Sequence, residues 1–441
     1  MAPSKDPLSE SGASAELPCV GIVIGSLEVG GAQRMALALA HGLLQAGWEV
    51  RLIALDRDRE MALPGTAAEQ AALSARIRTL SQRSSRASTV IKALAFPGLL
   101  IRLEQLIAEE ELASVISFME RANLLNLAGW QRAVRIVSVR KHITMALAAK
   151  PWLKRRLIVA AYPRLLRRAA AVVFNARGSA ADFMRSFPIP AERTAVIPNT
   201  VDDVILEQAR SPPTGPGTDW LGPYSVVAAG RLISDKGFVS LLRAFRQVLD
   251  RIPRARLIIL GDGPLRAHLL AVAAALGISE HVVLTGFQNS PYSWLARAGV
   301  FALPSRSEGF PNALLEAMRL GRACVATDCP TGPRELLAPE AAIDQVVTGR
   351  ETTAYGVLIP PIPRTDLPAH APLDAGESAL AEALAELLED NGLRDRLGTA
   401  AAAHAAGYTP QAALAQWQSL LRKQLALRDT VSAGTDEQPH H

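Results

Sequence analysis

The sequence predicts an α/β fold in which two doubly wound parallel sheets form two domains. Short β-branched runs alternate with longer amphipathic segments rich in alanine and leucine, which is the βα order of a parallel sheet. Residues 209–223 interrupt this series with four prolines and three glycines within 15 residues, a composition typical of a linker. The chain has 441 residues, of which 49% are hydrophobic, and this is enough for two separate cores.

The first series predicts an N-terminal Rossmann-like domain over residues 18–208. Amphipathic periodicity predicts helices over residues 32–46 and 99–109. Residues 1–17, which precede the domain, are small and polar, and we expect them to form a disordered tail. The expected buried strands are residues 20–24, 50–54, 114–118, 135–139, 171–174 and 194–197.

The second series predicts a C-terminal Rossmann-like domain over residues 224–407. Residues 340–378 are rich in proline and predict an irregular, elaborated loop. Residues 408–427 predict a closing helix that could pack across the linker, and residues 428–441 a second disordered tail. The expected strands are residues 225–229, 256–260, 281–284, 300–303 and 323–327.

Composition excludes several classes of protein. No run approaches the roughly 20 apolar residues of a membrane-spanning helix, and the N-terminus does not resemble a secretory signal. The three cysteines are too few and too scattered for a disulfide framework or a zinc site, and they favour a reducing cytosol. The formal charge is +5, but between Glu120 and Asp182 there are 13 basic residues and no acidic ones. An anionic partner is therefore expected in that part of the chain.

The strongest motif is the segment EGFPNALLE, which runs from Glu308 to Glu316 after the strand at 300–303. Pro311 suits a first helical turn, so we expect a helix over residues 311–320 that stops at Gly321. Its free N–H groups and positive dipole end suit an anionic phosphate. The two glutamates could bind different hydroxyl groups of one long ligand. An ordinary capped helix is the simpler interpretation of the same residues.

Two further motifs follow the first strand of each domain. The turn GRLISDKG carries Arg231 and Lys236, and a guanidinium beside an ammonium suits a diphosphate, although two surface cations would look the same. Gly30 and Gly31 lie between the first strand and the first helix of the N-terminal domain and allow close approach of a ligand to the backbone. The turn GDGP at residues 261–264 could border a base pocket.

Together these motifs resemble the retaining family 4 glycosyltransferases of GT-B fold. The resemblance rests on Arg231 and Lys236, the two glutamates, GDGP, the segment IPNTVD at residues 197–202 and VGGAQR at residues 29–34. It covers residues 19–427, and it implies two Rossmann-like domains that face a central cleft. The segments ATDCPTGPRELL, ISFMERAN and SVRKH look most like members that build lipid-linked oligosaccharides or polysaccharides.

The resemblance implies a role for each matching residue. Arg231 and Lys236 would hold the donor diphosphate and offset charge on the departing nucleotide. Glu308 would contact hydroxyl groups of the donor sugar, and Glu316 the ribose. The remaining donor-binding residues would lie against the diphosphate or the sugar: Gly30, Gly31, Phe310, Pro311, Asn312 and Ala313. Retention is attributed in this family to front-side attack, so no protein nucleophile is expected. Because there is no clear Asp-x-Asp at a strand end, we expect no metal and no other cofactor.

One departure from the family pattern concerns the reacting centre. Many relatives carry a histidine at the end of the strand that corresponds to residues 135–139. Here Arg140 takes that place and His142 follows two residues later, so either could act there, or the histidine could be structural. Glu120, Arg121 and Asn123 follow another strand and would line the acceptor side.

Residues 143–168 mix apolar side chains with seven Lys or Arg, a pattern of segments that lie in a membrane interface. An ordinary helix with a basic outer face is the alternative, and no nucleic-acid motif is present. We therefore expect a peripheral enzyme on the cytoplasmic face of the plasma membrane. It would move a hexose or N-acetylhexosamine from a nucleotide-diphosphate sugar, with UDP favoured, to a polyprenyl-diphosphate-linked saccharide. A sugar-nucleotide epimerase of the same architecture and a non-catalytic nucleotide-binding protein are the alternatives.

Overall fold

A computed structural model describes residues 17–28, 30–148 and 150–436. The expected tail over residues 1–17 therefore lies outside the described residues except at Leu17, and residues 437–441 of the second tail also lie outside them. Two compact units make up the chain: residues 1–136 with 421–441, and residues 137–420. The domain boundaries at 209–223 and 408 remain predictions.

The described part of the chain contains two seven-stranded sheets, of which the first runs in the order β3-β2-β1-β4-β5-β6-β7. Strand β1 pairs in parallel with β2 and β4, β2 with β3, and β6 with β7. Because the order reverses beside β1, this sheet is doubly wound. The strands are β1 (Val20–Ile24), β2 (Val50–Ala54), β3 (Ile77–Thr79), β4 (Ser114–Phe118), β5 (Val134–Val139), β6 (Ala171–Phe174) and β7 (Thr194–Val196).

Helices connect these strands, as expected for βα units. Buried leucines and an isoleucine of α4 pack with Val23, Ile53 and Val115 in one cluster, so α4 covers one face of the sheet. The helices are α1 (Gly31–Gln45), α2 (Ala67–Ala75), α3 (Thr89–Leu94), α4 (Phe96–Glu109), α5 (Glu120–Ala128), α6 (Ile143–Ala148), α7 (Trp152–Leu166), α8 (Arg177–Ser186) and α9 (Val204–Gln208), with a 3₁₀ turn η1 (Ala191–Arg193).

The second sheet has the order β10-β9-β8-β11-β12-β14-β13. Its pairs are parallel except for the antiparallel pair of β13 with β14 at one edge. Its strands are β8 (Gly222–Ala229), β9 (Arg256–Leu260), β10 (Val282–Gly286), β11 (Ala298–Leu303), β12 (Ala323–Thr327), β13 (Glu351–Thr352) and β14 (Val357–Ile359).

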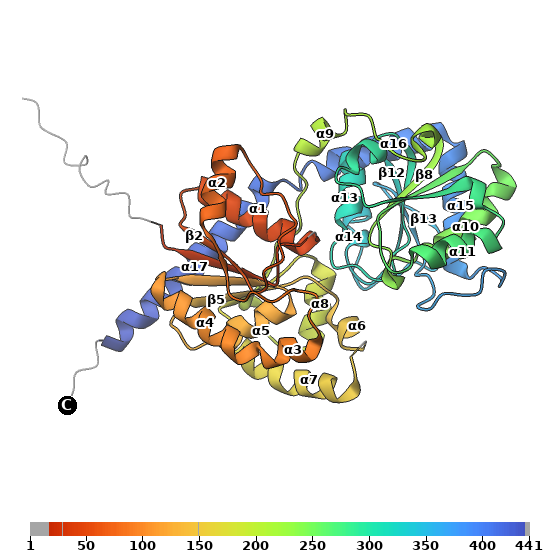
Figure 1. Ribbon diagram of the computed structural model, residues 1–441. Coiled ribbons are helices and arrows are strands. Elements are labelled where there is room, and N and C mark those ends of the chain that lie inside the picture. The colour runs from red at the N-terminus through yellow and green to blue at the C-terminus, as the bar shows by residue number, and fades with distance from the viewer. Residues whose placement is uncertain (1–16, 29, 149, 437–441) are drawn as a thin grey trace, which may run out of the picture. The chain divides into compact units, whose positions relative to one another are not determined.

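Helices cover both faces of the second sheet (Figure 1). The helices of this part are α10 (Phe238–Arg251), α11 (Arg266–Ala275), α12 (Tyr292–Leu295), α13 (Asn312–Arg319), α14 (Pro333–Leu337), α15 (Ala375–Glu389), α16 (Asn391–Ala405) and α17 (Pro410–Asp436). The 3₁₀ turns are η2 (Thr218–Trp220), η3 (Ser234–Lys236) and η4 (Ser279–His281).

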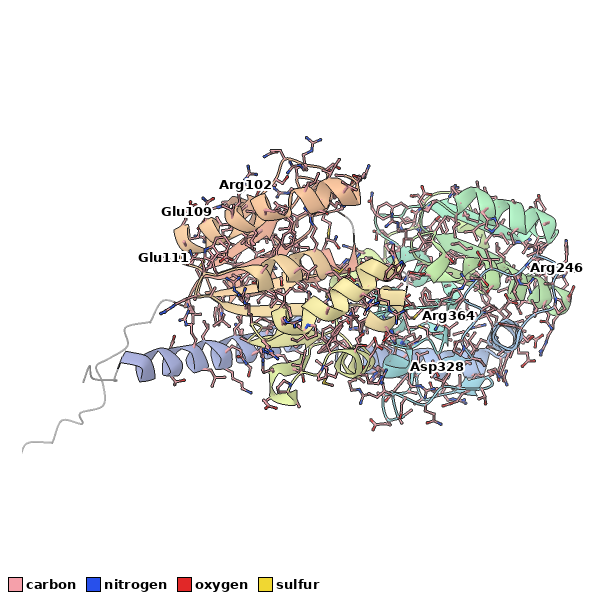
Figure 2. All side chains as sticks on the ribbon, turned by 90° about the horizontal axis from the view of Figure 1, so that it is seen from below. Arg102, Glu109, Glu111, Arg246, Asp328 and Arg364 are labelled. Atoms are coloured by element: carbon pink, nitrogen blue, oxygen red, sulfur yellow. The ribbon has the colours of Figure 1, made fainter. Side chains whose placement is uncertain are left out.

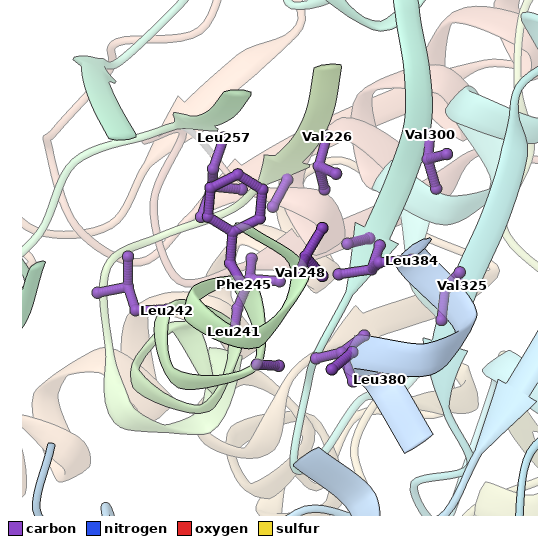
Figure 3. Packing of buried hydrophobic residues seen from close by; sticks show 14 of the residues in the cluster. Val226, Leu241, Leu242, Phe245, Val248, Leu257, Val300, Val325, Leu380 and Leu384 are labelled. Carbon is purple, nitrogen blue, oxygen red and sulfur yellow. The ribbon is translucent and has the colours of Figure 1, made fainter. Parts of the chain in front are cut away.

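Side-chain alternation divides the core of this sheet into two layers. Val226 packs with Phe245 of α10 and Leu384 of α15, as Figure 3 shows, whereas Val227 faces the cluster that contains Leu314 of α13. Burial of each such side chain contributes about 1.5–3 kcal/mol. Both faces are apolar, so the parallel strands can be continuous hydrophobic runs, and the loops at their carboxyl ends are left to carry polar residues.

The predicted strands are all confirmed to within three residues at each end, but two predictions need correction. Residues 340–378 are not wholly irregular, because β13, β14 and the start of α15 lie within them. Strands of two or three residues are too short to show periodicity. The predicted closing helix does not end at residue 427, since α17 continues to Asp436, and no proline interrupts its backbone hydrogen bonding after Pro410. None of the described helices is both long and apolar enough to cross a bilayer.

Candidate active site

An ion pair joins the turn after β8, which carries Lys236, to the loop after β11, which carries Glu308. The Lys236 ammonium lies 2.6 Å from Glu308 Oε1, and Ser305 Oγ donates to the same oxygen at 2.6 Å. Gly237 makes this approach possible, because its φ is +64° and a Cβ there would lie 2.0 Å from the Pro304 carbonyl oxygen. The structure thus joins two residues, 72 positions apart, that the sequence placed in separate motifs.

Helix α13 begins beside this pair. Pro311 is its N-cap, and no side chain caps the helix among the described residues. Asn312 and Ala313 form its first turn, and Gly321, at φ +71°, follows its end, so the prediction of this helix is confirmed to within one residue. An uncapped N-terminus offers N–H groups and positive potential to an anion.

The predicted donor-side residues Glu316, Phe310 and Arg231 lie on the same unit as this pair. Glu316 is on α13 and is 8% exposed. Phe310 is buried, with its ring centroid 5.9 Å from that of Tyr408. Arg231 is exposed on the turn that carries Lys236. The GDGP turn packs directly on this turn, because a Cβ at Gly261 would lie 2.0 Å from the Gly230 carbonyl oxygen.

Arg140 is linked to α13 through one amide side chain. Its guanidinium donates to Asn199 Oδ1 and, at 3.1 Å, to Ser138 Oγ. Asn199 is buried, and its Nδ2 donates to Asn312 Oδ1 at 2.6 Å. Burial lowers the pKa of Arg140 to about 10, so the side chain stays charged at neutral pH. Sequence reasoning missed the role of Asn199, although it lies in the IPNTVD segment that supported the family resemblance.

His142 has different partners. Its Nδ1 lies 3.1 Å from Asp182 Oδ2 on α8, and that carboxylate also accepts hydrogen bonds from Thr144. Burial lowers the pKa of His142, whereas the Asp182 charge opposes this shift; Arg185 and Arg364, the latter labelled in Figure 2, add to the lowering. The structure therefore connects Arg140 to the α13 N-terminus and His142 to α8.

The loop after β12, to which the sequence assigned no role, holds the backbone of Glu308 in place. Asp328, labelled in Figure 2, follows β12; its carboxylate pairs with Arg334 and accepts from the Val347 N–H at 2.9 Å. Thr331 Oγ1, in the same loop, donates to the Glu308 carbonyl oxygen. Glu335 lies in α14, which follows this loop, and accepts from the backbone N–H groups of Arg177 and Gly178 at 2.6 and 2.9 Å. It thereby caps α8, as an anion does at a helix N-terminus.

Two predicted donor-binding residues, Gly30 and Gly31, and the predicted acceptor-side residues belong to the unit that contains residues 1–136. Gly30 is the extended N-cap of α1, and Gly31 is its first residue. Glu120 and Arg121 begin α5, and Arg121 donates to the buried Asp56 carboxylate at 2.6 Å.

Asn123 is 2% exposed and accepts from Ser117 Oγ at 2.8 Å, so the structure places it inside the unit and not on a surface. Its position one turn into α5 turns its side chain back toward β4. Across residues 17–28, 30–148 and 150–436, no group of three or more His, Cys, Asp or Glu side chains could hold a metal ion.

The basic stretch at residues 143–168 forms α6, α7 and the residues beside them. Trp152 is 69% exposed and Val159 44%, and Arg155 and Arg156 are also exposed. Tyr162 is buried, and its ring lies 5.2 Å from that of Phe187, so it holds α7 in place and does not contribute to the outer face.

Two family models match the chain on either side of the predicted linker. Residues 29–204 match the model described as Glycosyltransferase Family 4, and residues 223–390 match the model described as Glycosyl transferases group 1. The chain belongs to the family 4 glycosyltransferases. The first match covers β2–β7 of the first sheet, and the second covers the turn of Lys236, the loop of Glu308 and helix α13.

Two relatives of this family 4 glycosyltransferase are themselves named as glycosyltransferases. An uncharacterised glycosyltransferase of Methanocaldococcus jannaschii is 31% identical over 253 residues, which are 56% of this chain and 62% of that protein. The N-acetylgalactosamine-N,N'-diacetylbacillosaminyl-diphospho-undecaprenol 4-alpha-N-acetylgalactosaminyltransferase of Campylobacter jejuni is 27% identical over 327 residues, 73% of this chain and 84% of that protein. The chain therefore spans less than two thirds of the first relative and most of the second.

Solved structures show the fold of this glycosyltransferase. Anabaena HepE in complex with UDP and glucose is similar to this chain with a TM-score of 0.69 at 18% identity. The match covers 92% of this chain and 100% of the HepE chain. Sucrose-phosphate synthase of Thermosynechococcus elongatus has a TM-score of 0.71 at 17% identity, with 93% and 100% covered. The predicted GT-B architecture is confirmed.

Proposed function

We propose that this protein is a retaining glycosyltransferase that moves a hexose or N-acetylhexosamine from a UDP-sugar to a lipid-linked saccharide. The observation that carries the proposal is the ion pair of Lys236 and Glu308 beside the uncapped N-terminus of α13. Arg231 lies exposed on the same turn, so two cations and a helix dipole are available to a diphosphate within one domain.

The chemistry follows from these charges. The bond between the anomeric carbon and the diphosphate oxygen breaks, and negative charge grows on the departing UDP. Lys236 and Arg231 would stabilise that charge, and Glu308 would bind hydroxyl groups of the sugar. The acceptor hydroxyl would form the new bond on the same face of the sugar, and its proton would pass to the departing phosphate oxygen. In this scheme no protein nucleophile and no metal is needed.

Two comparisons support the substrates. HepE was solved with UDP and with UDP-glucose, which favours a uridine nucleotide. The name of the Campylobacter relative specifies an undecaprenol-linked acceptor and an α linkage, and an α linkage formed from an α-linked nucleotide sugar retains configuration. The exposed arginines of α7 would hold the protein at the anionic cytoplasmic face of the membrane where such an acceptor lies.

The test is a transfer assay with a panel of UDP- and GDP-sugars, with EDTA present, and with undecaprenyl-diphosphate-linked saccharides as acceptors. We expect release of UDP to depend on the acceptor and the product to keep the anomeric configuration of the donor. Release of an altered free sugar without acceptor would favour the epimerase. Binding of UDP with no turnover across the panel would favour the non-catalytic alternative.

A further inference from the structure

Arg306 lies between β11 and Glu308, and sequence reasoning gave it no role. Its side chain is 4% exposed, which is unusual for an arginine and requires that its donors be satisfied. Each nitrogen of the guanidinium has a partner. Nε donates to the Pro363 carbonyl oxygen, Nη1 to the carbonyl and, at 3.1 Å, the hydroxyl of Ser234, and Nη2 to Asp366 Oδ1 at 2.6 Å.

These partners come from two other segments of the domain. Ser234 opens the 3₁₀ turn that ends at Lys236, and the Arg306 backbone N–H also donates to the Asp235 carbonyl oxygen at 2.8 Å. Both residues that precede Lys236 are therefore bound by Arg306. Pro363 and Asp366 belong to the irregular part of the Pro-rich segment, between β14 and α15.

The far end of that segment is fixed as well. Arg243 of α10 is fully buried, pairs with Glu377 at 2.9 Å, and donates to four carbonyl oxygens between Pro368 and Pro372. A buried guanidinium thus holds each end of the segment, that of Arg306 at one end and that of Arg243 at the other. It gives Arg306 a rigid surface opposite the turn of Lys236.

We propose that Arg306 is a positioning residue for the donor diphosphate. It fixes the Lys236 turn against the Glu308 loop, so that the ammonium is preorganised where the phosphate charge develops. A guanidinium is required, because its planar fork can donate in three directions at once, whereas a lysine ammonium cannot reproduce the fork geometry. The inference rests on the proposed function, since it assumes that Lys236 binds the donor phosphate.

The test is a double-mutant cycle read by calorimetric titration with UDP. We expect Arg306→Lys to raise the Kd for UDP by about tenfold in the wild-type background and by less than twofold in the Lys236→Ala background. The effects are not additive because both substitutions disrupt the same contact, that of the Lys236 ammonium with the phosphate. Uridine, which has no phosphate, should bind all four proteins equally. Asp366→Ala removes a single partner of Arg306 and keeps the carbonyl contacts. It should raise the Kd for UDP about threefold, and again only when Lys236 is present.

A purely structural role gives a different result. In that case Arg306→Lys lowers the melting temperature but leaves the Kd for UDP of the folded protein unchanged. Alternatively, Arg306→Lys raises the Kd for UDP by the same factor whether or not Lys236 is present. Either outcome overturns the proposal. If the wild-type protein binds neither UDP nor GDP, the proposed function fails instead, and the two failures are therefore distinguishable.

Discussion

Lys236 and Glu308 form an ion pair at 2.6 Å between loops that follow β8 and β11. The two strands are neighbours in the second sheet, although they are separated in sequence by β9 and β10. Parallel pairing brings their carboxyl ends to the same edge, which is where ligands bind in open α/β sheets. The pair therefore holds in place, before substrate binds, a cation for the phosphate and a carboxylate that can accept hydrogen bonds from sugar hydroxyl groups.

Removal of either partner should abolish most of the activity. We expect Lys236→Ala or Glu308→Gln to lower kcat by about 10²–10³, because each removes one electrostatic contact of the transition state. Steady-state kinetics on the acceptor-dependent reaction measures the effect. Arg246→Ala, on the exposed side of α10 and paired only with Asp250 in the described contacts, is the matched control and should keep full activity. Near wild-type turnover in both active-site variants would exclude the assigned roles.

Gly309 should tolerate no side chain. A Cβ at this position would lie 2.2 Å from the Arg140 carbonyl oxygen, so Gly309→Ala should cost about 1–3 kcal/mol of stability and displace the Glu308 loop. Denaturant unfolding and kcat should both change. Gly349→Ala is the control, because nothing lies within 4 Å of its Cβ, and it should be nearly neutral. Equal stability of the two variants would show that the loop relaxes freely.

The stability of the protein should fall in mild acid, in part through His142. Burial holds the pKa of His142 below its ordinary value of 6.5. Between the folded and unfolded pKa values the unfolded chain binds more protons, so the free energy of unfolding falls as pH drops below about 6.5. We expect the melting temperature of His142→Gln to depend less on pH between 7 and 5 than that of the wild type. His404, whose pKa burial also lowers, leaves part of the dependence in place. An unchanged slope would contradict this contribution of His142.

The basic face of α7 should bind anionic membranes. Each exposed arginine contributes roughly 1 kcal/mol at such a surface, so Arg155→Gln with Arg156→Gln should weaken cosedimentation with phosphatidylglycerol vesicles by about 10- to 30-fold. Arg246→Gln with Arg251→Gln removes the same charge from α10 and serves as the control. Equal loss in the two double variants would indicate an effect of net charge alone, without a docking surface.

Much of the fold could be predicted from the sequence, because short apolar runs mark buried parallel strands and amphipathic segments mark the helices between them. The strand at 256–260 was predicted from such a run, and helix α13 from Pro311 and Gly321 at its ends. Strands β3, β13 and β14 were not predicted, since runs of two or three residues rarely stand out from the surrounding sequence. They exist because the neighbouring strand already offers an edge for pairing.

The sequence by itself determined the α/β architecture, the candidate donor residues and the helix that begins after Pro311, because these depend on local composition and spacing. Only the tertiary structure decided how those residues are connected. It paired Lys236 with Glu308, joined Arg140 to Asn312 through Asn199, turned Asn123 inward and gave Arg306 three partners. Each of these contacts joins different secondary-structure elements or loops, and such pairings depend on how sheets and loops pack, which no local pattern encodes.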